Sequence, residues 1–246
     1  MGGTMPSKLG KLAAFSFVIA LACLFLGTSL AGPNYGSPWR GWRWTTLTGW
    51  GACPALPQSS DGRANSITLP WDNDGSLTIA LPASVSYAPG PQSSAVISGD
   101  PTLIGHVRLS AGRLSLDDDC DIPFGAVTVR LTGGPVKDWT VNGSGELHLA
   151  AIAQDRLALR LHGSAQATGE GTVDQLNLHI SGSGSVDLAR LAAKAAEIRI
   201  SGSGEAGIAA SESADVTLSG SGRVTLRGKP RLTTQIHGSG RIEEIP

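Results

Sequence analysis

The serine hydroxyls of a repeated tripeptide are the most regularly spaced reactive groups in this sequence. Gly-Ser-Gly occurs five times and Gly-Ser-Ala once, at intervals of 20, 19, 20, 18 and 18 residues. A serine nucleophile needs a Gly-x-Ser-x-Gly turn between a strand and a helix, with a histidine and an acid nearby. Six copies of one tripeptide indicate a repeated corner instead. We expect its serines to point into solvent as a ladder of candidate binding groups: Ser144, Ser164, Ser183, Ser203, Ser221 and Ser239.

Acidic side chains are densest at residues 117–119 and 121, which are all aspartate. Several carboxylates close together can hold Ca²⁺, and paired carboxylates can hydrolyse a glycosidic bond. A carbohydrate-active enzyme would need these aspartates to converge with Arg108 or Arg113 on one face. A solvated turn after a strand ending at Leu116 explains the same cluster without chemistry, and we favour that interpretation.

The histidines and cysteines predict no metal and no cofactor. Neither the His-x-x-x-His spacing of zinc proteases nor the Cys-x-x-Cys spacing of structural zinc occurs in the chain. His162 and His237 both stand immediately before a repeat glycine, at the place that Asn142 takes in another copy. A polar corner position explains this column, so we expect no catalytic set.

Tryptophans gather before the repeats, at Trp39, Trp42, Trp44 and Trp50, with arginines between them. Aromatic rings beside arginines suit stacking on sugars or lying at a membrane interface. They equally suit a cap that packs onto the open end of a repetitive core. We prefer the cap and keep the other two as alternatives.

The N-terminus indicates export. Two lysines precede an apolar run over residues 12–26, and residues 12–31 carry no charge. Small residues before Gly32 fit a signal peptide that is cleaved there, whereas the uncharged stretch is also long enough for a retained membrane anchor. Attachment of a lipid at Cys23, as in a lipoprotein, is a less favoured interpretation than either of these. In an oxidising compartment Cys53 and Cys120 could form a disulfide.

Composition restricts the class of fold and of partner. The chain has 41% hydrophobic residues, 5% aromatic residues, 33 glycines and a formal charge of −1. Few rings and many glycines suit thin stacked coils better than a bulky globular core. The absence of a basic patch in the sequence argues against a nucleic-acid partner.

Alternating apolar residues surround each tripeptide and predict an all-β solenoid. Apolar columns recur two and four residues before the first glycine and two residues after the third position of each copy. Alternation places such columns on one face of a strand, and stacking coils of 18–20 residues buries them together. Earlier alternation, for example in residues 76–81 and 126–131, predicts strands that either join this solenoid or form a separate cap.

Two local features qualify this pattern. Residues 188–197 are rich in alanine and allow a short helical turn within one repeat. At the other end, Glu243, Glu244 and Pro246 should discourage addition of a further strand.

Several motifs resemble one known family. They are Ala-Val-Ile-Ser-Gly-Asp at residues 95–100, Ser-Gly-Ser-Gly at Ser181, Ser201 and Ser219, and Arg-Gly-Lys-Pro at residues 227–230. The chain resembles the "putative auto-transporter adhesin, head GIN domain" family of bacterial envelope proteins over roughly residues 66–245. The resemblance implies a right-handed parallel β-helix-like domain with no known catalytic residues. Ala165 departs from the family's glycine, and Leu226-Arg227-Gly228 lacks the aromatic residue that often stands before this glycine in the family.

We therefore divide the chain into a signal peptide or anchor (1–31), a linker or N-terminal cap (32–65) and a solenoid domain (66–246). The leading hypothesis is a non-catalytic exported binding or adhesive module, whose partner is a glycan or a protein of the envelope or its surroundings. The alternatives are a carbohydrate-active enzyme and a membrane-tethered assembly scaffold that contacts the membrane through residues 12–31.

Overall fold

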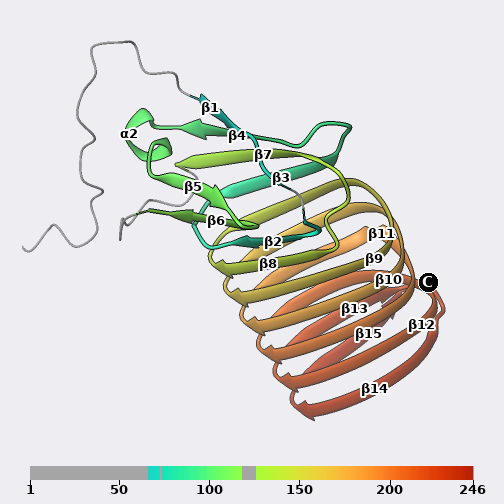
Figure 1. Cartoon of the computed structure of the whole chain (residues 1–246). Helices are drawn as coiled ribbons and strands as arrows, with labels where there is room; N and C mark the ends of the chain where they lie inside the picture. The colour runs from blue at the N-terminus through green and yellow to red at the C-terminus, as the bar shows by residue number, and fades with distance from the viewer. Residues whose placement is uncertain (1–65, 73, 118–125, 246) are drawn as a thin grey trace, which may run out of the picture. The chain divides into compact units, whose positions relative to one another are not determined.

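A parallel β-solenoid dominates the computed structural model, which describes residues 66–72, 74–117 and 126–245. Four long strands, each close to a full coil, form its centre: β9 (Glu146–Gly163), β10 (Gln166–Gly182), β11 (Ser185–Gly202) and β12 (Glu205–Gly220). Each pairs with the next in parallel. Figure 1 shows these strands stacked side by side. The predicted all-β solenoid is confirmed.

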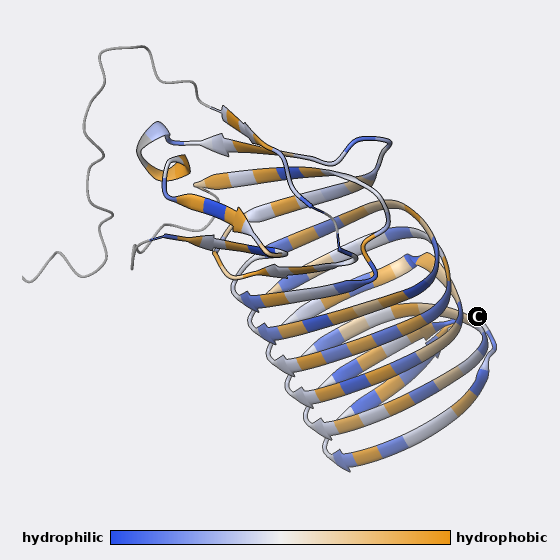
Figure 2. Cartoon of the chain, viewed as in Figure 1, coloured by the Kyte–Doolittle hydropathy of each residue, from blue (hydrophilic) through white to orange (hydrophobic). Residues whose placement is uncertain are grey.

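The predicted apolar columns form the core. Val141, Leu161, Ile180, Ile200 and Leu218 are hydrogen-bonded register partners from coil to coil, and all are at most 2% exposed. Hydrophobic and hydrophilic residues alternate along the strands (Figure 2), because successive side chains of a strand point to opposite faces. The outward face is therefore free to carry polar groups.

The tripeptides form the corners between coils. Gly202 has φ of 120°, and a Cβ there would lie 2.4 Å from the carbonyl oxygen of Gly182. The next residue, Ser203, donates its N–H to that same carbonyl at 2.9 Å. Only glycine allows both the conformation and the close approach. The third position tolerates a methyl group in one coil, where Ala165 is fully buried.

The segment before the repeats joins the solenoid, but its coils do not stack in chain order. β2 (Ser76–Ile79) pairs in parallel with β8 (Asp138–Gly143), and β3 (Ser84–Pro89) pairs with β9. β7 (Val127–Gly133) and β6 (Arg113–Leu116) then pair with the outer sides of β3 and β2. The coil of β2 and β3 thus lies between strands that follow it in the sequence.

Antiparallel strands cover this end of the sheet. β4 (Ser94–Gly99) pairs with β7, β1 (Ser66–Leu69) pairs with β4, and β5 (Val107–Ser110) pairs with β6. A four-residue helix, α2 (Pro101–Ile104), links β4 to β5. The core here holds the rings of Tyr87 and Trp139, whose centroids are 5.1 Å apart.

Shorter strands finish the other end: β13 (Arg223–Arg227), β14 (Arg231–Gly238) and β15 (Arg241–Ile245). β14 pairs with β12, and β15 pairs with β13. Thr234 replaces the apolar residue of its column, and Ile236 is 44% exposed. Glu243 and Glu244 are exposed on β15, and Glu244 is the register partner of the buried Leu226. A charge in an inward column disfavours stacking of a further strand.

The short helical turn expected in residues 188–197 is wrong. This stretch is continuous β11, and its pairing shifts register between Leu188 and Ala192 and again between Ala193 and Ala195. Ala193 and Ala196 are 3% and 4% exposed. Small side chains let the strand bend through this corner while it stays paired, and the pairing outweighs the helical preference of alanine.

Candidate functional site

Three columns beside the glycine corners form a regular lattice that is polar at every position except Ala158, and we call this lattice the polar face. They lie one, three and five residues before the first glycine of each tripeptide, on strands β8, β9, β10, β11, β12 and β14. Neighbouring members of a column are separated by about 4.8 Å, the spacing of paired strands. The nearest column is Asn142, His162, Ser181, Ser201, Ser219 and His237; the middle one is Thr140, Arg160, His179, Arg199, Thr217 and Gln235; the third is Asp138, Ala158, Asn177, Glu197, Asp215 and Thr233.

The predicted serine ladder lies at the edge of the polar face. All six corner serines, Ser144, Ser164, Ser183, Ser203, Ser221 and Ser239, are exposed. From the second coil on, each donates its backbone N–H to the glycine carbonyl of the preceding coil at 2.9 Å. The side-chain hydroxyls therefore project from a backbone that these hydrogen bonds between coils hold in place. Their role in binding stays a prediction.

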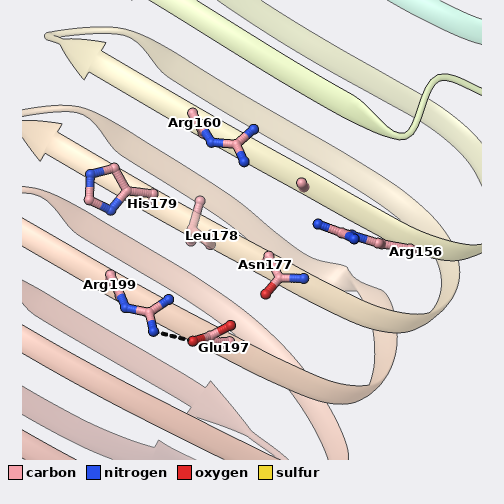
Figure 3. Close-up of a pocket in the computed structure, with 8 residues that line it drawn as sticks. Arg156, Arg160, Asn177, Leu178, His179, Glu197 and Arg199 are labelled. Carbon is pink, nitrogen blue, oxygen red and sulfur yellow. Dashed lines mark ion pairs between the residues drawn. The ribbon is translucent and has the colours of Figure 1, made fainter. Parts of the chain in front are cut away.

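A shallow groove interrupts the polar face across β9, β10 and β11. Its volume is about 350 Å³, and its lining includes Arg156, Arg160, Asn177, His179 and Arg199. The side chains of Arg156 and Arg160 extend toward each other along β9 (Figure 3). Between them in the sequence is Ala158, whose column neighbours are Asp138 and Asn177. Its methyl group leaves the hollow that a longer side chain would fill.

Two carboxylates offset part of the positive charge of the groove. Asp138 lies 3.4 Å from Arg160, and Glu197 forms an ion pair with Arg199. The side chains of Arg160 and Arg199 remain 47% and 57% exposed. Arg156 makes no ion pair with any described residue. The groove thus keeps one uncompensated guanidinium beside two that are partly neutralised.

His179 lies in the middle of this row, with Arg160 and Arg199 as its register partners. Burial lowers the pKa of His179 below its ordinary value, and the nearby His162, Arg199 and Arg160 lower it further. The rings of His162 and His179 are 6.2 Å apart. Near pH 7 the imidazole is therefore neutral, and it offers one hydrogen-bond donor and one acceptor.

The acidic cluster contributes one described member, Asp117. It forms an ion pair with Arg108, and its Oδ1 lies 3.1 Å from Nδ1 of His106. His106 is buried and the side chain of Asp117 is 27% exposed, so the contact ties the start of β5 to the end of β6. Arg113 is exposed. Asp118, Asp119 and Asp121 lie outside the described residues. Within the described ranges, no group of three or more His, Cys, Asp and Glu side chains could hold a metal ion.

The remaining candidate residues also lie outside the described part of the chain. They are Trp39, Trp42 and Trp44, the proposed disulfide between Cys53 and Cys120, and the apolar residues 12–31. Among the described helices, none has the length and hydropathy needed to cross a membrane.

The row of Arg160, His179 and Arg199 was missed by sequence reasoning. The signal was present: these residues stand three places before successive glycines, between the two apolar columns and therefore on the opposite face of the strand. Only two outward positions of each repeat were considered from the sequence, the corner serine and the residue before the first glycine. The repeat does not mark Arg156 as part of a charged column, because its register partner on the next coil is Gln175.

The fold and the polar face define a class of protein: a parallel β-solenoid whose described part displays polar side chains on coil after coil. Residues 124–230 match the family described as "Putative auto-transporter adhesin, head GIN domain". The predicted resemblance to this family is confirmed over these residues. No curated protein matches the chain.

Among solved structures that are similar to the chain, one supports the same architecture. A "putative adhesin" from Bacteroides fragilis NCTC 9343 is 18% identical with a TM-score of 0.58, over 73% of this chain and 96% of that one. A "putative lipid binding protein" from Parabacteroides distasonis ATCC 8503 is 18% identical with a TM-score of 0.48, over 76% and 98%. A "putative adhesin" from Parabacteroides merdae ATCC 43184 is 16% identical with a TM-score of 0.49, over 76% and 98%. At these identities the first structure supports the fold alone.

Proposed function

We propose that this protein is an exported, non-catalytic adhesive module that presents its polar face to a ligand outside the cell. One observation carries the proposal: polar side chains occupy every position but Ala158 in three columns across six strands, beside a ladder of exposed serines. A surface that repeats hydrogen-bonding groups on a paired backbone suits an extended partner, because little conformational entropy is lost on binding.

Two findings support adhesion over catalysis. The family that residues 124–230 match carries the description "Putative auto-transporter adhesin". The best candidate acid of the described chain, Asp117, is engaged by Arg108 and by the buried His106. A glycosidase needs two carboxyl groups on either side of a bound sugar, whereas the described contacts of the Asp117 carboxylate are with a cation and an imidazole.

The family match and the predicted N-terminal segment support a site of action outside the cell. An adhesin acts at or beyond the cell surface, and residues 12–31 would direct export or anchor the chain. Sequencing the N-terminus of the mature protein separates the two forms. Cleavage before Gly32 supports release from the signal, and an intact Met1 or Met5 supports a tether.

The test of adhesion uses the full chain, produced in an exporting host, against an array of glycans and envelope proteins. A double variant, Ser183→Gln with Ser203→Gln, places longer side chains on the ladder. Loss of about two hydrogen bonds should weaken binding roughly tenfold. A control, Thr172→Gln with Ser211→Gln, makes the same kind of change at exposed positions elsewhere on the coils and should bind normally. Absence of any ligand for the wild-type chain, or equal loss in both variants, would count against the proposal.

A further inference from the structure

The groove on the polar face points to one chemical class of ligand. We infer that Arg156, Arg160 and Arg199 bind the carboxylate or sulfate groups of an acidic polysaccharide, whose chain runs along the polar face from coil to coil. This inference rests on the proposed adhesive function and names the ligand class of that surface.

The charges favour an anion. Arg156 has no ion pair among the described residues, and it lies on the same strand as Arg160, across the small Ala158. Guanidinium groups bind carboxylates and tetrahedral oxyanions through paired N–H donors. The amide of Asn177 and the imidazole of His179 line the same hollow and can complete the hydrogen bonding of an anionic group.

The direction of the row favours a polymer. Arg160, His179 and Arg199 are register partners on three successive coils, so the two guanidiniums repeat along the solenoid axis at about twice the strand spacing of 4.8 Å. Beside them runs the column that contains Ser181 and Ser201. A polymer of acidic sugars presents both anions and hydroxyl groups at regular intervals, which matches a row of cations next to a row of hydroxyls.

Other anionic macromolecules fit the described surface less well. A membrane surface is usually bound through apolar side chains that enter the lipid, but the exposed large apolar residues of the described chain are Ile236 and Ile245, on β14 and β15. Single-stranded nucleic acid is held by stacking on aromatic rings, and the described Trp71, Tyr87 and Trp139 are all buried.

A second cationic pair on the coils provides a matched control. Arg190 and Lys194 lie on β11 and are exposed, as Arg156 and Arg160 are on β9. Their partners are Glu170 at 3.5 Å and Asp174 at 2.7 Å. This surface has one carboxylate for each cation, so it has no excess charge for an anionic ligand. Replacing either pair by glutamine changes the net charge of the protein equally.

The experiment measures binding of the full chain to immobilised heparin, polygalacturonate and neutral dextran, and to vesicles containing phosphatidylglycerol. Heparin or polygalacturonate should bind, dextran should not, and added salt should weaken binding through screening. The variant Arg156→Gln with Arg160→Gln should raise the Kd by about tenfold or more. The control Arg190→Gln with Lys194→Gln should change it by less than about twofold. Each variant must keep the wild-type midpoint of urea unfolding, as expected for exposed side chains.

Three results would overturn the inference: no binding to either acidic polymer, equal loss in the two glutamine pairs, or stronger binding to the vesicles than to the polymers. Failure here is separable from failure of adhesion itself. If another ligand on the array depends on Ser183 and Ser203, the adhesive function stands and the acidic ligand is wrong. If the array also shows no ligand, both are wrong.

Discussion

Replacing Gly202 with alanine should lower the free energy of unfolding by about 2–4 kcal/mol. Gly202 has φ of 120°, and holding a side chain in such a backbone region costs about 1–3 kcal/mol. The new Cβ would also lie 2.4 Å from the Gly182 carbonyl oxygen. That oxygen must move away, which weakens its 2.9 Å bond from the Ser203 N–H and costs about 1 kcal/mol more.

A second glycine separates strain from crowding. Gly143 has φ of 90°, but a Cβ there would meet no atom within 4 Å. Gly143→Ala should therefore cost about 1–2 kcal/mol from conformation alone. A third change, Gly207→Ala, has neither problem, because its φ is not positive and its nearest contact would be 3.4 Å from Asp187. This variant should match the wild-type chain or exceed it slightly.

Urea unfolding followed by circular dichroism measures all three variants on one scale. The reasoning predicts the order Gly202→Ala, Gly143→Ala, Gly207→Ala, from least to most stable. Equal loss at Gly202 and Gly143 would mean that carbonyl crowding is absorbed by a small shift of the coil. Equal stability of all three would refute the argument that the corner requires glycine.

Three further outcomes are expected. Leu218→Ala should cost about 2–5 kcal/mol in urea unfolding, whereas Ile236→Ala in the same column should cost less than about 1 kcal/mol, because these side chains are 0% and 44% exposed. Trp139→Ala should cost about 3–5 kcal/mol in the same assay, because the fully buried indole packs on Tyr87. The pKa of His179 is lowered from its ordinary 6.5, so near and below pH 6.5 the unfolded chain binds more protons than the folded chain. The free energy of unfolding should therefore fall as the pH drops below 6.5. His179→Gln should remove this part of the fall in urea midpoints measured across the pH range.

The interior of the repeats could be predicted because the core of a solenoid constrains every coil alike. Leu161, Ile180 and Ile200 must be apolar, since each covers the same column of the next coil. The order of the early coils could not be predicted. Strand alternation marks β2 and β7 as half-buried strands, but it carries no information on which neighbour each one pairs with. The structure places β3 between β7 and β9.

Outward positions are not constrained by packing against the next coil, and for this reason the groove was not predicted from the sequence. An outward position has no common requirement, so Thr140, Arg160, His179 and Arg199 share a column without sharing a chemistry. The hollow depends on a single small residue, Ala158, between two arginines. A site of this kind is a local departure from the repeat, and it becomes visible once the register aligns three coils. The regular columns therefore identify what builds the solenoid, and the irregular ones identify where a ligand can be recognised.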